Sequence, residues 1–380
     1  MRQSKKIHKI AYVTGTRAEF GYMKQSLQEL NHLSEVEVVI IATGMHTASG
    51  FGKTISEVKS SGLRVIAIAD GNDGKTLESM AVSVAKNLSL IVPLLSIEKP
   101  QLLIIEGDRG EQLAAGLAAS YLNIPILHRG GGNTSGNIDN KIRSALTAIA
   151  DYHFPSNREI GKILAARGIP KKNIYNIGGP VPDMIMQKEY LAEKSCREKY
   201  NLTEGPLLVL VFHPVTEENG NGKEQIREIL KAIKIFKYQT IAIGSNSDAE
   251  GRYINEVLKS FEKETPFLQF YTHIPRYDYL GLLNVADLLI GNTSSGFSEL
   301  PSFKKPYILV GNRQHKRFGE KRHILNVRPE YTSISQAIKR ALTDKTFRRN
   351  LRFLRNPYGN GDFYKQFPKA VLSILKTLPE

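Results

Sequence analysis

Short apolar runs alternate with longer segments of helical periodicity from one end of the chain to the other. In the first half, the runs that predict strands are IAYVTG (10–15), VEVVIIATG (36–44), QLLIIEG (101–107), IPILHRG (124–130) and YHFPS (152–156). The segments that predict helices between them are about 19–33, 79–95, 109–122 and 138–150. Strands and helices that alternate in this way form βαβ units, and these units build parallel sheets.

The alternation pauses at a segment rich in glycine and proline and then starts again. NIYNIGGPVPD (173–183) predicts a connector, and residues 184–202 predict a polar helix. Later strands are predicted at LLVLVFH (207–213), TIAIGS (240–245), FLQFYT (267–272), LLIGN (288–292) and PYILVGN (306–312), with helices near 222–237, 249–262, 277–285 and 334–343. In open α/β sheets, ligands bind at the carboxyl ends of the strands.

The pattern therefore predicts an α/β protein of two Rossmann-like domains. The first domain is expected at residues 1–180 and the second at 184–360, with a ligand-binding cleft between them. An amphipathic segment, 363–380, follows a Pro-Tyr-Gly-Asn-Gly turn signal, and we expect it to pack back on the first domain.

Length, composition and cysteine content narrow the class of protein. A chain of 380 residues fits two domains of ordinary size, and 41% hydrophobic with 23% charged residues indicates a globular protein. The single cysteine, Cys196, cannot form an internal disulfide, which favours a reducing cytoplasm. No uninterrupted apolar run reaches the ~18 residues of a membrane span, and the basic N-terminus lacks the apolar segment of a signal peptide.

The chain carries a net charge of +15, from 52 Lys and Arg against 37 Asp and Glu. Such a charge suggests an anionic partner, and nucleic acid is one class. However, the basic residues are spread along the chain except for one dense run at 339–355, and no zinc-finger spacing or RNP-type aromatic motif accompanies them. We therefore expect no nucleic-acid partner, since a solvated basic face or a phosphate-bearing small molecule explains the charge equally well.

Polar motifs follow the predicted strands of the first half. GTRAEFG (15–21) opens a helix, where free N–H groups and the Arg17 guanidinium favour an anion, although an ordinary turn with a surface arginine is the alternative. EGDR (106–109) brings an acid and an arginine out together at the end of a strand; a helix cap with a solvated arginine is the alternative there. The loop RGGGNTSGNID (129–139) lets the backbone approach a polar substrate, or is merely flexible.

The second half carries three further polar segments after strands. His213 ends LLVLVF, where a histidine is more often a structural hydrogen-bonding group than a catalyst. GNTSSGFSE (291–299) begins a helix, so its hydroxyl and N–H groups converge on an anion site. Its Glu299 lies one turn into the helix, in reach of ribose hydroxyls. RQHKR (313–317) adds cations to the same site.

Taken in order, these segments resemble the UDP-N-acetylglucosamine 2-epimerase family, in the UDP-hydrolysing branch of sialic-acid-type pathways. The motifs that carry the resemblance are GTRAEFG (15–21), TGMH (43–46), EGDR (106–109), SGNID (135–139), HPVT (213–216), GNTSSG with ELPSF (291–303) and RQ-x-x-R (313–317). GTRAEFG is typical of the hydrolysing branch, because the other branch usually has a proline after the arginine. The resemblance covers nearly the whole chain and implies a GT-B fold.

The resemblance also implies the roles of individual residues. Nucleotide and phosphate binding is expected at Arg17, Ser294, Ser295, Gly296, Glu299 and Arg313. Catalysis is expected at Asp108, Asp139, His213 and Asn133, and contact with the sugar at Arg109, His46, Gly131, Gly132 and Ser135. No cofactor and no metal is expected, the partner is a nucleotide-sugar substrate, and the family tendency suggests a homodimer.

One of these positions departs from the family pattern. In the family, an acidic residue follows the paired glycines of the loop before SGNID, and here Asn133 stands in its place. The family reaction removes UDP with the C2 proton to give a glycal, then adds water and reprotonates C2. Each half-reaction needs a proton acceptor or donor, which an amide is not at physiological pH. We therefore expect Asp108 and Asp139 to share the proton transfers.

The sequence favours a hydrolysing 2-epimerase that releases UDP and a ManNAc-type sugar from UDP-GlcNAc or a related UDP-amino sugar, such as a 6-deoxy or diamino sugar. Three alternatives from other classes stay open. One is a nucleotide-sugar hydrolase that does not epimerise C2, and another is a catalytically silent nucleotide-sugar binder. A GT-B glycosyltransferase has the same fold class but needs an acceptor site that the sequence does not reveal.

Overall fold

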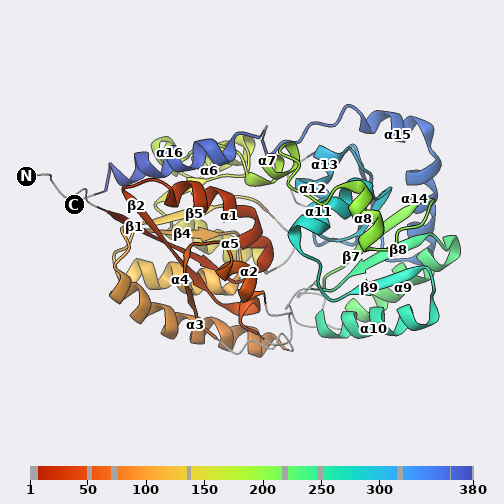
Figure 1. Ribbon diagram of the computed structural model, residues 1–380, viewed down its shortest axis with the longest axis horizontal. Helices are drawn as coiled ribbons and strands as arrows, with labels where there is room; N and C mark the ends of the chain where they lie inside the picture. Colours follow the sequence, from red (N-terminus) through yellow and green to blue (C-terminus); the bar gives the residue numbers. More distant parts are fainter. Residues whose placement is uncertain are drawn as a thin grey trace, which may run out of the picture.

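The structure, a computed structural model, describes residues 7–48, 54–69, 76–134, 138–215, 221–245, 251–314, 320–359 and 361–378. Two parallel sheets, each flanked by helices, stand side by side, the first at the left of Figure 1 and the second at the right. The prediction of two Rossmann-like α/β units is confirmed by these sheets.

The first sheet has the strand order β3-β2-β1-β4-β5-β6 and is parallel throughout. Its strands are β1 (His8–Thr14), β2 (Val36–Ala42), β3 (Arg64–Ala67), β4 (Leu102–Glu106), β5 (Ile126–Arg129) and β6 (Tyr152–Phe154). The helices are α1 (Arg17–Asn31), α2 (Ile55–Lys59), α3 (Leu77–Glu98), α4 (Gly110–Tyr121), α5 (Asp139–Ile149), α6 (Arg158–Ala166) and α7 (Pro180–Met186), with short 3-10 turns η1 (Gly44–His46) and η3 (Lys171–Asn173).

The second sheet has the order β12-β11-β10-β7-β8-β9 and is also parallel. Its strands are β7 (Leu207–Val211), β8 (Gln239–Ile243), β9 (Leu268–Tyr271), β10 (Leu288–Gly291), β11 (Tyr307–Val310) and β12 (Ile324–Val327). The helices are α8 (Glu193–Lys199), α9 (Gly222–Phe236), α10 (Gly251–Glu264), α11 (Arg276–Val285), α12 (Ser295–Ser298), α13 (Leu300–Phe303), α14 (Tyr331–Thr343) and α15 (Lys345–Leu351).

The segment between the two sheets differs from its prediction. The expected connector, 173–183, ends in helix α7, because a proline at the first helical position lacks only an N–H that would be unpaired anyway. The expected single helix over 184–202 is wrong, since α7 stops at Met186 and α8 begins only at Glu193. Lys188 between them has a φ of 56°, in the left-handed region that a helix cannot contain.

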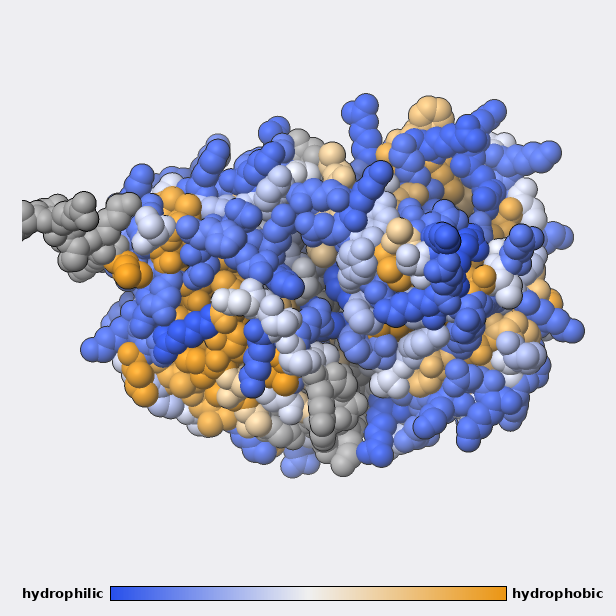
Figure 2. Space-filling view, in the orientation of Figure 1, coloured by the Kyte–Doolittle hydropathy of each residue, from blue (hydrophilic) through white to orange (hydrophobic). Residues whose placement is uncertain are grey.

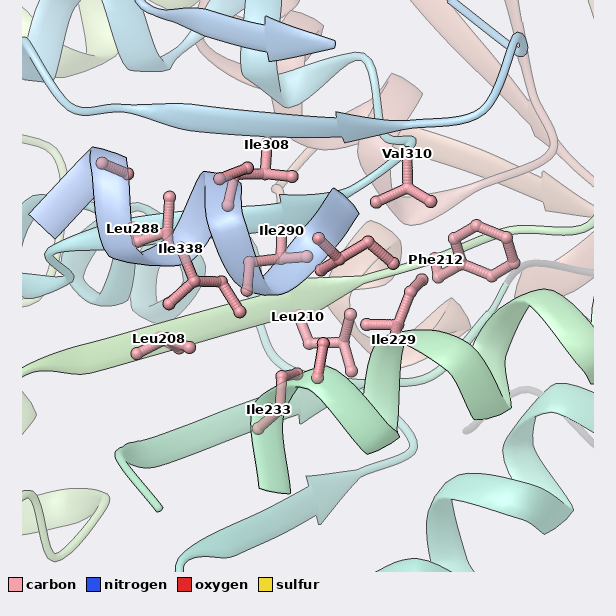
Figure 3. Packing of buried hydrophobic residues seen from close by; sticks show 14 of the residues in the cluster. Leu208, Leu210, Phe212, Ile229, Ile233, Leu288, Ile290, Ile308, Val310 and Ile338 are labelled. Atoms are coloured by element: carbon pink, nitrogen blue, oxygen red, sulfur yellow. The ribbon is translucent and has the colours of Figure 1, made fainter. Parts of the chain in front are cut away.

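Apolar side chains fill both faces of each sheet. Figure 3 shows one such cluster, in which Leu208 and Leu210 of β7 face Ile229 and Ile233 of α9, and Ile338 of α14 closes the group. Burying an aliphatic side chain of this size contributes about 1.5–3 kcal/mol. The clusters therefore fix the sheets as rigid supports and leave the loops at the strand ends free to carry polar groups.

The chain crosses between the sheets twice, and the two crossings touch. The N–H of Gly179 donates to the carbonyl oxygen of Tyr358 at 2.7 Å. After the second crossing, α16 (Phe363–Leu375) packs on α1 in the core of the first sheet, where Phe363 and Phe367 are buried (Figure 1). The exact domain limits at 180 and 184 stay a prediction.

Candidate active site

A cavity of about 390 Å³ lies where the carboxyl ends of both sheets face each other. Its lining comes from the loops after β1, β2, β4, β5 and β6 on one side and after β7 to β11 on the other. This volume is within the range of small-molecule sites. Nine of the residues expected from the sequence line it: Arg17, Asp108, Arg109, Asn133, Asp139, His213, Ser294, Ser295 and Arg313.

Asp108 follows β4 and is held by an arginine that the sequence analysis missed. Arg143 of α5 forms an ion pair with Asp108 through Nη2 and donates from Nη1 to the carbonyl oxygen of Asn133 at 3.2 Å. The Arg143 side chain is only 4% exposed, against 24% for Asp108. Arg143 lies four residues after Asp139, so helical spacing alone places both on one face of α5 and was a usable signal.

Asn133 uses its amide to close its own loop. Its Nδ2 donates to the carbonyl oxygen of Gly130 at 3.3 Å and to Ser156 Oγ at 3.0 Å. The residue is buried. Asn133 therefore fixes the loop beside Asp108, which is consistent with the view that it does not transfer protons.

Two contacts join the sheets across the cavity. Arg313 Nη2 donates to Asp139 Oδ2 at 3.4 Å. Arg17 contacts His273 Nε2, so that nitrogen accepts the hydrogen bond. Burial lowers the pKa of Arg17 to about 10, with Glu57 opposing the shift. Arg17 thus remains a cation at neutral pH and lies at the boundary between the two sides.

The turn that carries Arg17 differs from its prediction. The N–H groups of Gly15 and Thr16 both donate to Glu19 Oε2, at 2.9 and 3.2 Å, and Thr16 Oγ1 accepts from the N–H of Glu19. This is a capping box, and it uses the N–H groups of Gly15, Thr16 and Glu19. These three N–H groups are therefore not available to an anion, and the expectation that this turn binds one through Arg17 stays a prediction.

His213 faces the cavity from the end of β7. Its backbone is clamped by Asn292, which accepts from the His213 N–H at 2.8 Å and donates to its carbonyl oxygen at 2.7 Å. Its Nδ1 lies 3.3 Å from Ser245 Oγ. The imidazole is half-buried and lines the cavity, so the histidine has both a structural contact and access to a ligand.

Glu299 is fully buried directly beneath the cavity wall. Its Oε1 accepts from Arg276 Nη1 at 2.7 Å, from Tyr22 Oη at 3.3 Å and from Ser295 Oγ at 3.4 Å. Arg276 also stacks on the Tyr22 ring, with 4.5 Å from the guanidinium carbon to the ring centroid. Because Tyr22 belongs to α1, this network ties the two sides together. No motif marked Tyr22 or Arg276, and the ribose role of Glu299 stays a prediction.

His46 lies behind the cavity wall rather than on it. Its two ring nitrogens contact Thr14 Oγ1 at 3.1 Å and Thr54 Oγ1 at 2.9 Å. Burial lowers its pKa to about 4, so the ring is neutral at physiological pH. In this arrangement the side chain braces the turns after β1 and β2, and its expected contact with a sugar stays a prediction.

Three glycines of the predicted site pack against neighbouring side chains. A Cβ on Gly131 would lie 2.8 Å from His128 Nδ1, and one on Gly132 would lie 2.7 Å from Leu164 Cδ2. A Cβ on Gly296 would lie 2.0 Å from the Tyr307 ring. These positions need glycine for close packing behind the wall. Ser135 lies outside the described residues.

The arrangement separates two kinds of chemistry within one cavity. Carboxylates and their arginine partners lie at the first sheet, and hydroxyls with a histidine and an arginine lie at the second. The former suit proton transfer, and the latter suit a phosphate group. Among the described residues, no group of three His, Cys, Asp or Glu is placed to hold a metal ion.

The profile of the UDP-N-acetylglucosamine 2-epimerase family matches residues 28–372. The UDP-N,N'-diacetylbacillosamine 2-epimerase (hydrolyzing) of Legionella pneumophila is 30% identical over 375 residues, which cover 98% of this chain and 97% of that protein. Polysialic acid biosynthesis protein P7 of Escherichia coli is 32% identical over 358 residues, covering 92% and 90%.

Among solved structures, the UDP-GlcNAc 2-epimerase of Neisseria meningitidis bound to UDP-GlcNAc superposes with a TM-score of 0.81 at 17% identity, covering 96% of this chain and 100% of that one. This likeness confirms the GT-B type fold that the sequence resemblance implied. The match of the family profile and the identity to the relatives over nearly the full length confirm the resemblance itself. The chain belongs to the UDP-N-acetylglucosamine 2-epimerase family and is similar to its hydrolysing branch.

Proposed function

We propose that this protein is a hydrolysing UDP-sugar 2-epimerase, which converts a UDP-linked 2-acetamido sugar and water into UDP and the free sugar inverted at C2. One observation carries the proposal. The cavity brings Asp108 and Asp139 from the first sheet opposite Ser294, Ser295 and Arg313 from the second. Carboxylates and a phosphate site in one cavity are what a reaction needs that moves a proton while a diphosphate leaves.

The second sheet would hold the nucleotide. The hydroxyls of Ser294 and Ser295 donate to phosphate oxygens, and Arg313 supplies a guanidinium beside them. Arg17 reaches the diphosphate from the first sheet, and His213 stands next to the leaving oxygen. Positive groups placed where negative charge develops lower the barrier to departure of UDP.

The first sheet would carry the proton transfers. In the first half-reaction, a carboxylate takes the C2 proton, the C1–O bond breaks with its electron pair leaving on UDP, and a C1=C2 double bond forms. In the second, a carboxylic acid gives a proton to C2 from the other face, and water adds to C1 and loses its proton to a carboxylate. Asp108 and Asp139 are the carboxylates that line the cavity from this side, and the Arg143 ion pair fixes Asp108 in position.

The identity of the sugar has two candidates. UDP-GlcNAc is the substrate in the family's name, and a UDP-diamino sugar is favoured by 30% identity to the Legionella relative over 98% of this chain. Each should be incubated with the protein in deuterated water, with free UDP and deuterium at C2 followed by NMR. Release of UDP with C2 deuterium supports the proposal and identifies the sugar. Release of UDP without deuterium replaces it with plain hydrolysis, and no release from either sugar replaces it with a binding protein.

We also propose a homodimer formed through α3, which carries apolar side chains on its outward side as well as on its buried side. Its buried side packs Ile91 and Leu95 into the core and includes Asn87, which accepts from Thr43 Oγ1 at 2.6 Å. Its outward side carries exposed Val82, Leu90 and Ile97. Figure 2 shows hydrophobic residues gathered in this region at the lower left. By length and composition alone α3 could cross a membrane, but its contacts with the sheet make it a layer of the fold.

The occupant of this face is expected to be a second copy. Glu78 and Lys86 lie two turns apart on the exposed side, so an antiparallel copy pairs each with its opposite, and Ala81 and Ala85 allow close approach. Val82→Glu should give a monomer in sedimentation velocity, whereas Ile235→Glu, at an exposed apolar site on α9, should leave the dimer intact. A monomeric wild type, or wild type that binds lipid vesicles through α3, would refute the dimer.

We further propose that the protein works in the cytoplasm. Its single cysteine, Cys196, is a free and buried thiol, which suits a reducing compartment. Fractionation of cells that produce the protein tests this location, and recovery with an oxidising compartment would contradict it.

A further inference from the structure

Two buried glutamates, Glu19 of α1 and Glu111 of α4, meet under the loops that carry Arg17, Asp108 and Arg109. We propose that they form a carboxylate pair that shares one proton and holds these loops in the geometry that binds the substrate. Both are positioning residues, because neither takes part in the proton transfers at C2. The inference rests on the proposed function for its substrate, but not for the pair itself.

Glu19 fastens the loop after β1. Its Oε2 accepts from the N–H groups of Gly15 and Thr16, and Gln112 Nε2 lies 3.4 Å away. Gln112 in turn donates to the carbonyl oxygen of Val13 at 3.0 Å. The carboxylate is buried but lies against the cavity lining. Its position therefore sets the path of the backbone that presents Arg17.

Glu111 joins three loops at once. A Cβ on Gly15 would lie 1.7 Å from Glu111 Oε1, and one on Gly44 would lie 3.3 Å from the same atom. The carboxylate therefore fills the space that these two glycines leave after β1 and β2. The same oxygen accepts from Arg109 Nε at 2.9 Å, which ties the loop after β4 to the other two. Both glutamates thus reach Gly15, one through hydrogen bonds and one by close packing.

The charges around the pair do not balance. Arg109, the residue before α4, is a cation that faces the pair, Tyr12 of β1 donates to the Glu19 carbonyl oxygen, and the neighbouring His46 of η1 is neutral. Burial and the charge of Glu111 raise the pKa of Glu19 to about 7, while Arg109 opposes the shift. Two carboxylates that share the charge of Arg109 are most stable when one of them is protonated.

This placement links the pair to substrate binding. A diphosphate near Arg17 and Arg109 adds negative charge next to the pair, which favours the protonated form. When the shared proton is lost, both glutamates are charged. They then repel each other and compete for Arg109, so the loops no longer fit the substrate. Affinity should therefore fall as pH rises through the pKa of Glu19, with little change in the chemical step.

The test compares KM and kcat between pH 6 and 9 in the wild type, Glu19→Gln and Glu111→Gln. In the wild type, KM should rise by up to about tenfold per pH unit above the pKa, and kcat should stay within about twofold. Both variants should lose this slope. Glu98→Gln is the matched control, because Glu98 is an equally buried carboxylate that pairs with Lys9 and Arg64 at the opposite edge of the same sheet.

A second arm needs no substrate. Because the pKa of Glu19 is raised on folding, its stabilisation is complete below its ordinary pKa and is lost as pH rises through about 7. Wild type should thus lose unfolding temperature relative to Glu19→Gln between pH 5 and 8. If the unfolding temperatures of wild type and Glu19→Gln change with pH in parallel, the shared proton is overturned. If the KM of the wild type does not vary with pH, or if Glu19→Gln keeps the same rise of KM with pH, the positioning role is overturned. No turnover of any UDP-sugar overturns the proposed function alone, and the unfolding arm then decides on the pair.

Discussion

On the first sheet's side of the cavity, ion pairs with arginine hold two of the lining carboxylates. On the second sheet's side a side-chain amide holds His213, and the ion pair of Arg276 with Glu299 lies beneath the cavity wall. Arg143 pairs with Asp108 and Arg129 with Glu106 at the ends of β4 and β5. Opposite them, Asn292 clamps the backbone of His213. Ion pairs control protonation and placement together, and amide clamps control placement alone. The comparison predicts that mutations of Asp108 and its arginine partner on the first side change turnover, and that mutation of Glu299 on the second side changes nucleotide affinity.

The largest expected effect breaks the proton chemistry of the first side. Asp108→Asn should lower kcat by about 10²–10⁴-fold, because it removes a group that transfers a proton in the proposed reaction. Affinity for UDP, measured by calorimetry, should stay nearly unchanged, since the nucleotide contacts lie on the other side. Unfolding temperature is the control, because the change also removes the charge partner of Arg143. Unaltered turnover would remove Asp108 from the catalytic role.

A second change, at Arg143, tests how much the position of Asp108 matters while the Asp108 carboxylate itself is kept. Arg143→Gln leaves Asp108 present but without its ion pair and leaves the Asn133 loop without a donor. Breaking a buried pair costs about 3 kcal/mol of unfolding free energy, which urea titration measures. Arg143→Lys keeps the charge but not the forked geometry, so it should recover part of the stability and of kcat. Full activity in Arg143→Gln would show that Asp108 needs no support.

The next prediction tests the second side through Glu299. Glu299→Gln should weaken UDP by about tenfold, because a neutral amide accepts weaker hydrogen bonds than a carboxylate. Binding of inorganic diphosphate should change little. Tyr22→Phe is the control, as it removes only the contact from α1 to Glu299. If both ligands weaken equally, Glu299 serves the buried network with Arg276 rather than the ribose.

The smallest expected effect is on protein stability, and it comes from changing the side-chain amide of Asn133. Asn133→Asp should lower the free energy of unfolding by about 1 kcal/mol, because a carboxylate cannot donate to Gly130 and would repel its carbonyl oxygen. Thermal unfolding measures this loss. Restoring an acid here should not raise epimerisation, since the side chain is turned into the loop. A gain in epimerisation would mean that the loop rearranges to bring residue 133 to the sugar.

The fold could be predicted well because its strands are buried apolar runs. The missed strand β3 explains the limit: it is a short edge strand of four residues whose ends, Arg64 and Ala67, are exposed, although the apolar run VIAIA (65–69) was a usable signal. The missed break between α7 and α8 depends on a single left-handed backbone at Lys188, which no pattern of side chains announces.

The part of the site that could be predicted from the sequence consists of residues in loops that directly follow strands. Residues in motifs, such as Asp108 and Ser294, come together in the cavity. Tyr22 and Arg276 stand on separate helices and meet only because the two sheets face each other. At Gly132, packing against Leu164 already requires the glycine, and its expected contact with the sugar stays a prediction. Local sequence cannot separate these cases, since both depend on contacts between distant segments.

The paired crossings at Gly179 and Tyr358 make the second sheet and its helices an insertion within the first unit. An insertion held by two adjacent tethers differs from a domain on one flexible linker. Both tethers are hydrogen-bonded to each other at one point, so any change in the angle between the two units is expected to be centred there. Gly178 and Gly359 beside this point have positive φ values of 82° and 146°, conformations that glycine adopts without strain. A change in the angle between the two units would alter the separation of Asp139 and Arg313, whose contact across the cavity is 3.4 Å in this structure.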